Sequence, residues 1–242
     1  MLPDGSMTVP DTTLIKDTER FHSLVRVLST VFPNREPNSI RIVDLGCMEG
    51  GYSLELARIG YSVVGIEGRL AHFKRCQFLK ETFRFEHLEF IHGIVQDLDE
   101  HGTFDVVYAS GILYHLDSPV DFLMRIGKVT KKLLLLNTHY SGERVPSRFR
   151  HKLSALTTHE GKRGRWYEEW PPGTDPEEVA EMSRSSIGNH RSFWLRKDSL
   201  LDTIREAGFD LIFEQYDCHY DMAKALQAIH RNARGMFVAL KS

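Results

Sequence analysis

The sequence has few cysteines. Cys47, Cys76 and Cys218 are the three among 242 residues, and they lie far apart in the chain. Their odd number and wide spacing argue against a disulfide framework, and no Cys-x-x-Cys pair or His/Cys cluster has the spacing of a zinc site. The sequence therefore predicts a protein of a reducing compartment that binds no metal.

The sequence also lacks a large excess of charge of either sign, and it has no long apolar run. The formal net charge is −2, since 31 Lys and Arg stand against 33 Asp and Glu. Bulk charge thus indicates neither a nucleic-acid-binding nor a membrane-surface protein. Apolar runs such as residues 133–136 are far shorter than the ~20 residues that cross a bilayer. The N-terminus also lacks the basic and apolar regions of a signal peptide, so we expect a cytoplasmic protein with no membrane partner.

The chain does contain a regular alternation of β-branched apolar runs and helical patterns. We expect strands at residues 40–45, 61–67, 88–95, 104–109, 132–137, 210–216 and 235–241, and helices at 15–32, 52–58, 70–83, 120–126, 197–207 and 222–230. Strands separated by helices imply right-handed crossovers and a parallel sheet that is covered on both faces. We therefore predict one α/β domain over residues 1–242, with a lead-in and a helix in residues 1–38.

The alternation stops in residues 140–192. This segment contains several prolines and glycines, with Trp166, Tyr167 and Trp170 between them. About fifty residues are too many for an ordinary loop, and such a length is typical of a functional lid or an inserted subdomain. We predict that it forms an insert on the substrate side of the domain.

A glycine-lined loop follows the first strand of the sheet. The strand ends in Asp44, and Gly46 and Gly50 frame the turn into the next helix. Open α/β sheets bind ligands at the carboxyl ends of their strands, although many βα turns contain glycine for local reasons. The second strand ends in Glu67, an acid placed where it can hydrogen-bond both hydroxyls of a ribose.

A dinucleotide is a poorer fit to this loop. A NAD site prefers Gly-x-Gly-x-x-Gly, whereas Met48 stands at the middle position and Glu49 adds a negative charge next to the helix N-terminus. A carboxylate there is unfavourable for a pyrophosphate. Asp44 and Glu49 instead favour a ligand without phosphates that carries a cationic end.

These segments, with Phe104–Val107 and Gly111–Leu116, resemble class I (Rossmann-like) S-adenosylmethionine-dependent methyltransferases. The resemblance implies a doubly wound, mostly parallel seven-stranded sheet with an antiparallel last strand. It implies S-adenosylmethionine as cofactor and S-adenosylhomocysteine as product. The cofactor-binding residues that it implies are Asp44, Gly46, Cys47, Met48 and Gly50 on the methionine side, Glu67 and Gly68 at the ribose, Gln96 and Asp97 near adenine, and Ser110 and Gly111 beside the sulfur.

The sequence departs from this family at two positions. Met48 replaces the usual middle glycine, and Ile94 stands where an acid often follows the third strand, with Asp97 three positions later. Residues 111–119 also resemble the tRNA wobble-uridine carboxymethyltransferase group. Those enzymes have a long N-terminal extension, and fewer than fifty residues precede the glycine loop here.

Two histidines are candidates for a general base. His139 follows the fifth predicted strand and His115 follows the fourth, both at the sheet edge where a substrate would lie. A base that removes a proton from an oxygen nucleophile contributes ~10²–10⁴-fold to rate. Either histidine could instead hydrogen-bond to the backbone in a purely structural role.

Aromatic and cationic residues of the insert are candidates for substrate binding. We predict that the acceptor contacts Tyr114, Tyr140, Arg165, Trp166, Tyr167 and His190. Such side chains can stack on a planar group and pair with an anion. Packing of the insert tryptophans on the core is the alternative.

The function predicted from the sequence is methyl transfer to a small-molecule acceptor, to an oxygen of a natural-product or sugar intermediate. We expect no metal, because no Asp and Asp-Asn arrangement of a magnesium-dependent catechol site is evident. Alternatives are a tRNA-modifying methyl- or carboxymethyltransferase with RNA as partner, a non-catalytic cofactor-binding subunit, and a NAD-dependent oxidoreductase.

Overall fold

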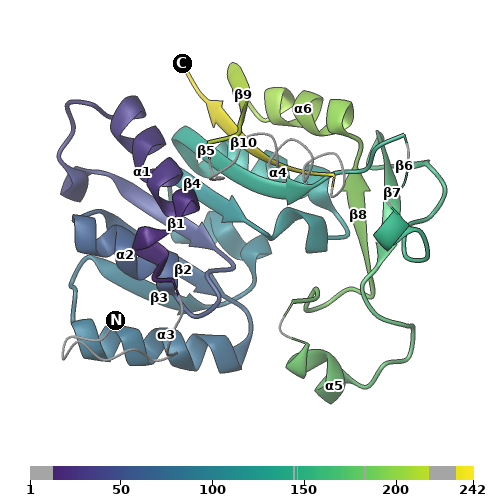
Figure 1. Cartoon of the computed structure of the whole chain (residues 1–242), viewed down its shortest axis with the longest axis horizontal. Helices are drawn as coiled ribbons and strands as arrows, with labels where there is room; N and C mark the ends of the chain where they lie inside the picture. Colours follow the sequence, from purple (N-terminus) through teal and green to yellow (C-terminus); the bar gives the residue numbers. More distant parts are fainter. Residues whose placement is uncertain (1–12, 144, 146, 183, 218–232) are drawn as a thin grey trace.

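A computed structural model describes residues 13–143, 145, 147–182, 184–217 and 233–242. Its centre is a seven-stranded sheet in the order β3-β2-β1-β4-β5-β10-β9 (Figure 1). The strands are β1 (Arg41–Leu45), β2 (Ser62–Glu67), β3 (Leu88–His92), β4 (Phe104–Ser110), β5 (Thr130–His139), β9 (Leu211–Gln215) and β10 (Arg234–Leu240).

The pairing of the strands confirms the predicted fold class. Strands β3, β2, β1, β4 and β5 are mutually parallel, whereas β10 is antiparallel to both β5 and β9. The strand order reverses between β1 and β4, which makes the carboxyl ends of these two strands a crevice suited to a ligand.

Helices cover both faces of this sheet. They are α1 (Glu19–Val31), α2 (Gly51–Ile59), α3 (Leu70–Phe83), α4 (Pro119–Val129) and α6 (Lys197–Glu206), while the short α5 (Pro176–Glu181) lies apart from the sheet. Pro119 is at the first position of α4, where its missing N–H costs no helical hydrogen bond.

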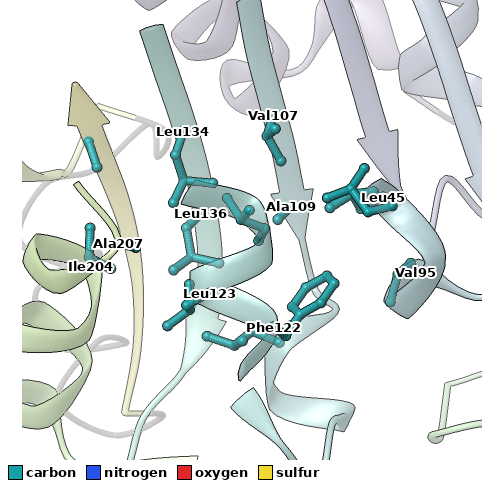
Figure 2. Packing of buried hydrophobic residues seen from close by; sticks show 14 of the residues in the cluster. Leu45, Val95, Val107, Ala109, Phe122, Leu123, Leu134, Leu136, Ile204 and Ala207 are labelled. Carbon is teal, nitrogen blue, oxygen red and sulfur yellow. The ribbon is translucent and has the colours of Figure 1, made fainter. Parts of the chain in front are cut away.

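Alternate strand residues supply two separate hydrophobic cores. On one face Val107, Ala109 and Leu136 pack with Phe122 and Leu123 of α4 (Figure 2). The residues next to them in sequence point the other way, into a second core with α1 and α2. Because each strand is buried on both faces, it reads in the sequence as a continuous apolar run.

The insert forms a small sheet of its own beside the large one. Its strands β6 (Thr157–His159), β7 (Lys162–Glu168) and β8 (Arg191–Leu195) are antiparallel neighbours in that order (Figure 1). The last strand ends at Leu195, three residues beyond the predicted end of the insert.

Some predicted elements have different ends in the structure. The helix predicted at 15–32 begins at Glu19, after a 3₁₀ turn at Ile15–Asp17, because the Thr18 side chain caps it by accepting from the Phe21 amide. The strand predicted at 88–95 ends at His92, since Val95–His101 forms 3₁₀ turns. The helix predicted at 222–230 lies outside the described residues.

In the described part of the chain, no helix has both the length and the apolar character needed to cross a membrane.

Candidate functional site

The glycine loop between β1 and α2 has an unusual backbone. Gly46, Met48 and Gly50 all have positive φ, at 64°, 52° and 76°. A non-glycine residue in this region costs roughly 1–2 kcal/mol, so Met48 needs a compensating contact. Its amide donates a hydrogen bond of 2.8 Å to Glu67 Oε2, and the acid at the end of β2 thereby holds the loop.

Glu67 is buried at the centre of this arrangement, with 4% of its surface exposed. Its other oxygen, Oε1, accepts a 2.8 Å hydrogen bond from the Arg69 amide. A carboxylate has about four lone-pair directions, so two backbone donors leave room for further donors such as hydroxyl groups.

The Asp44 carboxyl lies nearby at the end of β1. Its pKa is raised from 3.8 to about 7: burial is the largest cause and the charge of Glu67 adds to it, while a 2.7 Å hydrogen bond from Ser53 Oγ opposes both effects. A cationic ligand group beside Asp44 would favour its charged form.

Asp44, Met48 and Glu67 line a cavity of about 500 Å³ at the carboxyl ends of β1, β2 and β4. Its volume is within the range of small-molecule and cofactor sites. The Tyr108 hydroxyl is buried in its wall and makes no hydrogen bond of standard geometry within the described part of the chain. Tyr52 and Arg20 also line the cavity: the centroid of the Tyr52 ring lies 5.5 Å from that of Tyr108, and Arg20 interacts electrostatically with Tyr108. This end of the cavity thus offers donors for an anionic ligand group beside the carboxyl of Asp44.

One part of the insert covers the cavity. We call residues 184–189 the covering segment, and all six line the cavity. Ile187 lies so close to Gly68 that a Cβ on this glycine would be 2.5 Å from Ile187 Cδ1.

The Arg69 side chain anchors the covering segment. Its buried guanidinium donates to the carbonyl oxygens of Val179, Ala180, Ser185 and Ser186 at 2.9–3.1 Å. Burial lowers the pKa of Arg69, and the carboxylates of Glu67 and Glu169 oppose that shift. Arg69 therefore links Glu67 to the insert, through its amide on one side and its side chain on the other.

His115 pairs with a carboxylate of the insert. Its Nδ1 lies 3.0 Å from Oε1 and 3.1 Å from Oε2 of Glu169. His115 lines the cavity, whereas the Glu169 side chain is almost fully buried, with 2% exposed. The Ser192 hydroxyl and the Ser186 amide also donate to Glu169.

The cavity wall brings together most of the residues predicted to bind the cofactor. The cofactor-binding candidates that line it are Asp44, Gly46, Cys47, Met48, Glu67, Gly68, Gln96, Ser110 and Gly111. The substrate candidate Tyr114 and the base candidate His115 line it as well. Gly50 and Asp97 are not part of its lining. Asp97 is exposed on the turn after β3, while its neighbour Gln96 lines the cavity.

The other substrate candidates lie away from this wall, and their roles stay predictions. His139 stacks on Trp194 with ring centroids 4.8 Å apart, and Tyr167 stacks on the same indole at 4.6 Å. Trp166 packs against Phe193. The remaining three are Arg165, which donates to the carbonyl oxygens of Ser154 and Glu143, Tyr140, whose ring faces Lys197, and the exposed His190.

Several lining residues were not found from the sequence. Tyr108 had a usable signal, because it alternates with Ser110 along β4 and so shares its face. Arg20 and Arg69 had no such signal, since a single arginine in a helix or a loop belongs to no sequence motif that would predict its position. The covering segment is a short polar stretch whose position depends on the fold of the whole insert.

Within the described residues, no group of three or more His, Cys, Asp or Glu side chains is placed to hold a metal ion.

Comparison with known proteins identifies relatives. A family model described as a methyltransferase domain matches residues 17–214. The O-antigen chain terminator bifunctional methyltransferase/kinase WbdD of Escherichia coli is 28% identical over 127 residues, which are 49% of this chain and 17% of that protein. The tRNA U34 carboxymethyltransferase of Pseudomonas aeruginosa is 33% identical over 106 residues, or 42% of this chain and 32% of that protein. The matched stretches thus span about a third or less of these two relatives.

Solved structures resemble the whole fold. The N-terminal domain of EvdMO1 with SAH bound has a TM-score of 0.67 and 25% identity, covering 93% of this chain and 81% of that one. The same domain in the presence of SAH and D-fucose has a TM-score of 0.68 and 24% identity, covering 96% and 84%.

Proposed function

Because the chain belongs to the methyltransferase-domain family of class I, S-adenosylmethionine-dependent enzymes, we propose that it methylates a hydroxyl oxygen of a sugar-type small molecule. The observation that carries the proposal is the His115–Glu169 pair at the cavity wall. A hydroxyl nucleophile must lose its proton, whereas an unprotonated amine can attack directly. A histidine at the wall therefore favours an oxygen acceptor.

The residues present fit the cofactor. S-adenosylmethionine supplies an activated methyl group and leaves as S-adenosylhomocysteine. Glu67 has lone pairs left to accept from the ribose hydroxyls. Asp44 would face the amino group, while Arg20 and the Tyr108 hydroxyl would donate to the carboxylate. Gln96, in the turn after β3, would meet the adenine.

The acceptor would enter beside the segment after β4. Ser110, Gly111, Tyr114 and His115 line the cavity there. Their task is alignment of the hydroxyl oxygen with the methyl carbon, which in favourable cases supplies ~7–11 kcal/mol of the barrier. Removal of the proton is the separate task assigned to His115.

Two relatives support a sugar-type acceptor. One is named an O-antigen chain terminator methyltransferase/kinase, and the domain of the other was crystallised in the presence of D-fucose. The cavity also offers polar partners, such as the Ser110 and Tyr114 side chains, for the hydroxyl groups of a sugar.

The experiment is a methyl-transfer assay with labelled S-adenosylmethionine and a panel of hexoses, 6-deoxyhexoses, their nucleotide-linked forms and the matching amino sugars. Mass spectrometry would detect one added CH₂ unit and locate it. We expect methylation at oxygen, and His115→Asn should lower kcat by ~10²–10⁴-fold. Methylation only at the nitrogen of amino sugars, or full turnover by His115→Asn, would contradict the proposal.

A tRNA substrate is the second candidate, favoured by the 33% identity to tRNA U34 carboxymethyltransferase over 106 residues. Two cations near the insert sheet lie over aromatic rings, Lys152 over Tyr167 and Arg191 over Trp166, so they are partly engaged within the protein. Binding of tRNA that weakens steeply with salt would support this candidate, because phosphate contacts release counterions.

A further inference from the structure

We propose that Glu169 is the positioning residue of the reaction: it fixes the His115 ring so that Nε2 serves as the proton acceptor in the cavity. This inference rests on the proposed function for the identity of the reaction. The contact between Glu169 and His115, and the ring nitrogen that carries the proton, can be measured without knowing the acceptor. The inference can therefore be tested separately from the choice of acceptor.

The first step concerns the charge state of Glu169. Three donors converge on its two oxygens: the Ser192 hydroxyl at 2.7 Å, the Ser186 amide at 3.2 Å and the His115 ring at 3.0 Å. An ionised carboxylate is an acceptor at both oxygens, which matches this set of donors. Arg69, whose guanidinium interacts electrostatically with Glu169, offsets the negative charge in the buried site.

The second step concerns the imidazole. Because the group opposite Nδ1 is a carboxylate that accepts only, the ring proton of neutral His115 must lie on Nδ1. Nε2 then carries the lone pair. No hydrogen bond to Nε2 is made by the part of the chain that the structure describes, while the residue lines the cavity. The base is thus directed toward the space that the acceptor would occupy.

The third step separates this role from simple packing. The His115 backbone is already held, because its amide donates to the Ile112 carbonyl and its carbonyl accepts from Asn189 Nδ2. These bonds fix the backbone and do not by themselves set the ring, which also packs against the Tyr114 ring with centroids 4.3 Å apart. Packing on an aromatic ring does not choose between the two imidazole nitrogens, whereas the carboxylate of Glu169 at Nδ1 selects one tautomer.

The proton transfer follows from this arrangement. As the acceptor oxygen forms its bond to the methyl carbon, the hydroxyl proton passes to Nε2, and the C–S bond breaks with its electron pair going to sulfur. The resulting imidazolium lies against the Glu169 carboxylate, which stabilises its positive charge. Loss of the Nε2 proton to solvent restores the neutral ring.

The insert therefore contributes to catalysis as well as covering the cavity. Glu169 follows β7, and Ser186 belongs to the covering segment. The Glu169 carboxylate therefore contacts both His115 and the covering segment. A covering segment displaced from the cavity would take one hydrogen bond away from Glu169.

The test combines ¹⁵N NMR of the whole 242-residue chain with kinetics of Glu169→Gln. In the neutral form of the ring, which its two ¹⁵N shifts identify, the wild type should show His115 protonated at Nδ1. Glutamine has a single acceptor oxygen for three donors, so the variant should show a mixture of tautomers. Its kcat should fall by ~100-fold, with affinity for S-adenosylhomocysteine kept within about threefold.

Glu160→Gln is the matched control. Glu160 is also in the insert and accepts two backbone N–H bonds, from Val120 and Asp121, but it does not touch His115. We expect this variant to keep the wild-type tautomer and kcat.

The wild-type NMR reading needs no variant, so it decides the question even if Glu169→Gln does not fold. A wild-type ring protonated at Nε2 would overturn the proposal. So would a Glu169→Gln protein with unchanged tautomer and kcat. Nδ1 protonation without methylation of any sugar would refute the proposed acceptor and leave the positioning role standing.

Discussion

The buried carboxyl of Asp44 gives the cavity a defined response to pH. In the unfolded chain this group has an ordinary pKa of 3.8, and in the folded protein the pKa is about 7. Between these values the unfolded chain has lost the proton while the folded chain keeps it. The free energy of unfolding of the ligand-free protein therefore falls as pH rises through this window, and Asp44→Asn should remove that slope.

Ligand binding should show the linked effect. With Asp44 at the amino group of S-adenosylhomocysteine, as proposed, the cationic group would favour the charged carboxylate, so binding below pH 7 would release a proton. We expect affinity to weaken as pH falls from 7 to 6. Titrations at pH 6.5 in two buffers of different ionisation enthalpy would count the released proton. Equal release by the wild type and Asp44→Asn would contradict this assignment.

Gly46 offers a test of the loop geometry. Its φ is 64°, and an added Cβ would lie 2.5 Å from Ile112 Cδ1. Gly161 has a similar φ of 74° with no atom within 4 Å of an added Cβ. Gly161→Ala should cost roughly 1–2 kcal/mol from backbone strain alone. Gly46→Ala should cost more in thermal or denaturant unfolding, and it should also weaken S-adenosylhomocysteine binding. Equal costs for the two variants would show that the clash is relieved by a shift of Ile112.

The positions of single residues could be predicted where the end of a parallel strand determines them. Asp44 and Glu67 end parallel strands, so both had to reach the same sheet edge, and both line the cavity. His115 follows β4 and His139 is the last residue of β5, yet of these two only His115 lines the cavity, whereas His139 packs in an aromatic cluster with Trp194. The direction of a side chain after a strand depends on tertiary packing, which the sequence does not specify.

The covering segment is the element whose position depends most clearly on one side chain. Arg69→Ala removes the donors to four carbonyl oxygens and leaves the Arg69 amide bond to Glu67 in place. Hydrogen bonds to a charged group contribute ~1.5–3 kcal/mol each. We expect faster hydrogen exchange in residues 184–189 and at least about tenfold weaker cofactor binding.

Arg205→Ala, at an exposed ion pair with Asp202 on α6, is the control for this variant. It should change neither the exchange rates nor the affinity. Wild-type exchange rates in residues 184–189 of Arg69→Ala would contradict the anchoring role.

Regular elements were predicted well, and the insert sheet was not. The apolar spacing predicted α3 with its observed ends, Leu70–Phe83. The β6–β7 hairpin turns at Glu160 and Gly161, both with positive φ, and Glu-Gly lacks the usual Asn-Gly or Asp-Gly signal. The Glu160 side chain accepts from the first amides of α4, a long-range contact that supports its unfavourable backbone and that no local pattern indicates.

At the scale of the molecule, alternation of strands and helices was enough to predict a doubly wound sheet, because short right-handed crossovers leave few other topologies. The prediction that the last strand, β10, is antiparallel came from the family resemblance. The sequence placed the insert on the substrate side, but it did not predict the contacts that join the insert to the cavity, such as those of Arg69 with residues 179–186 and of Glu169 with His115.

The central claim is that the cavity at the ends of β1, β2 and β4 binds the methyl donor through Glu67. Calorimetric titration with S-adenosylhomocysteine tests it most directly, with Glu67→Ala, with Glu89→Ala as an exposed control on β3, and with a parallel titration of NAD. Glu67→Ala should weaken binding at least about tenfold, or about 1.4 kcal/mol. Glu89→Ala should bind like the wild type, and NAD should not bind. Binding of NAD in place of S-adenosylhomocysteine, or equal affinities for the two variants, would contradict the claim.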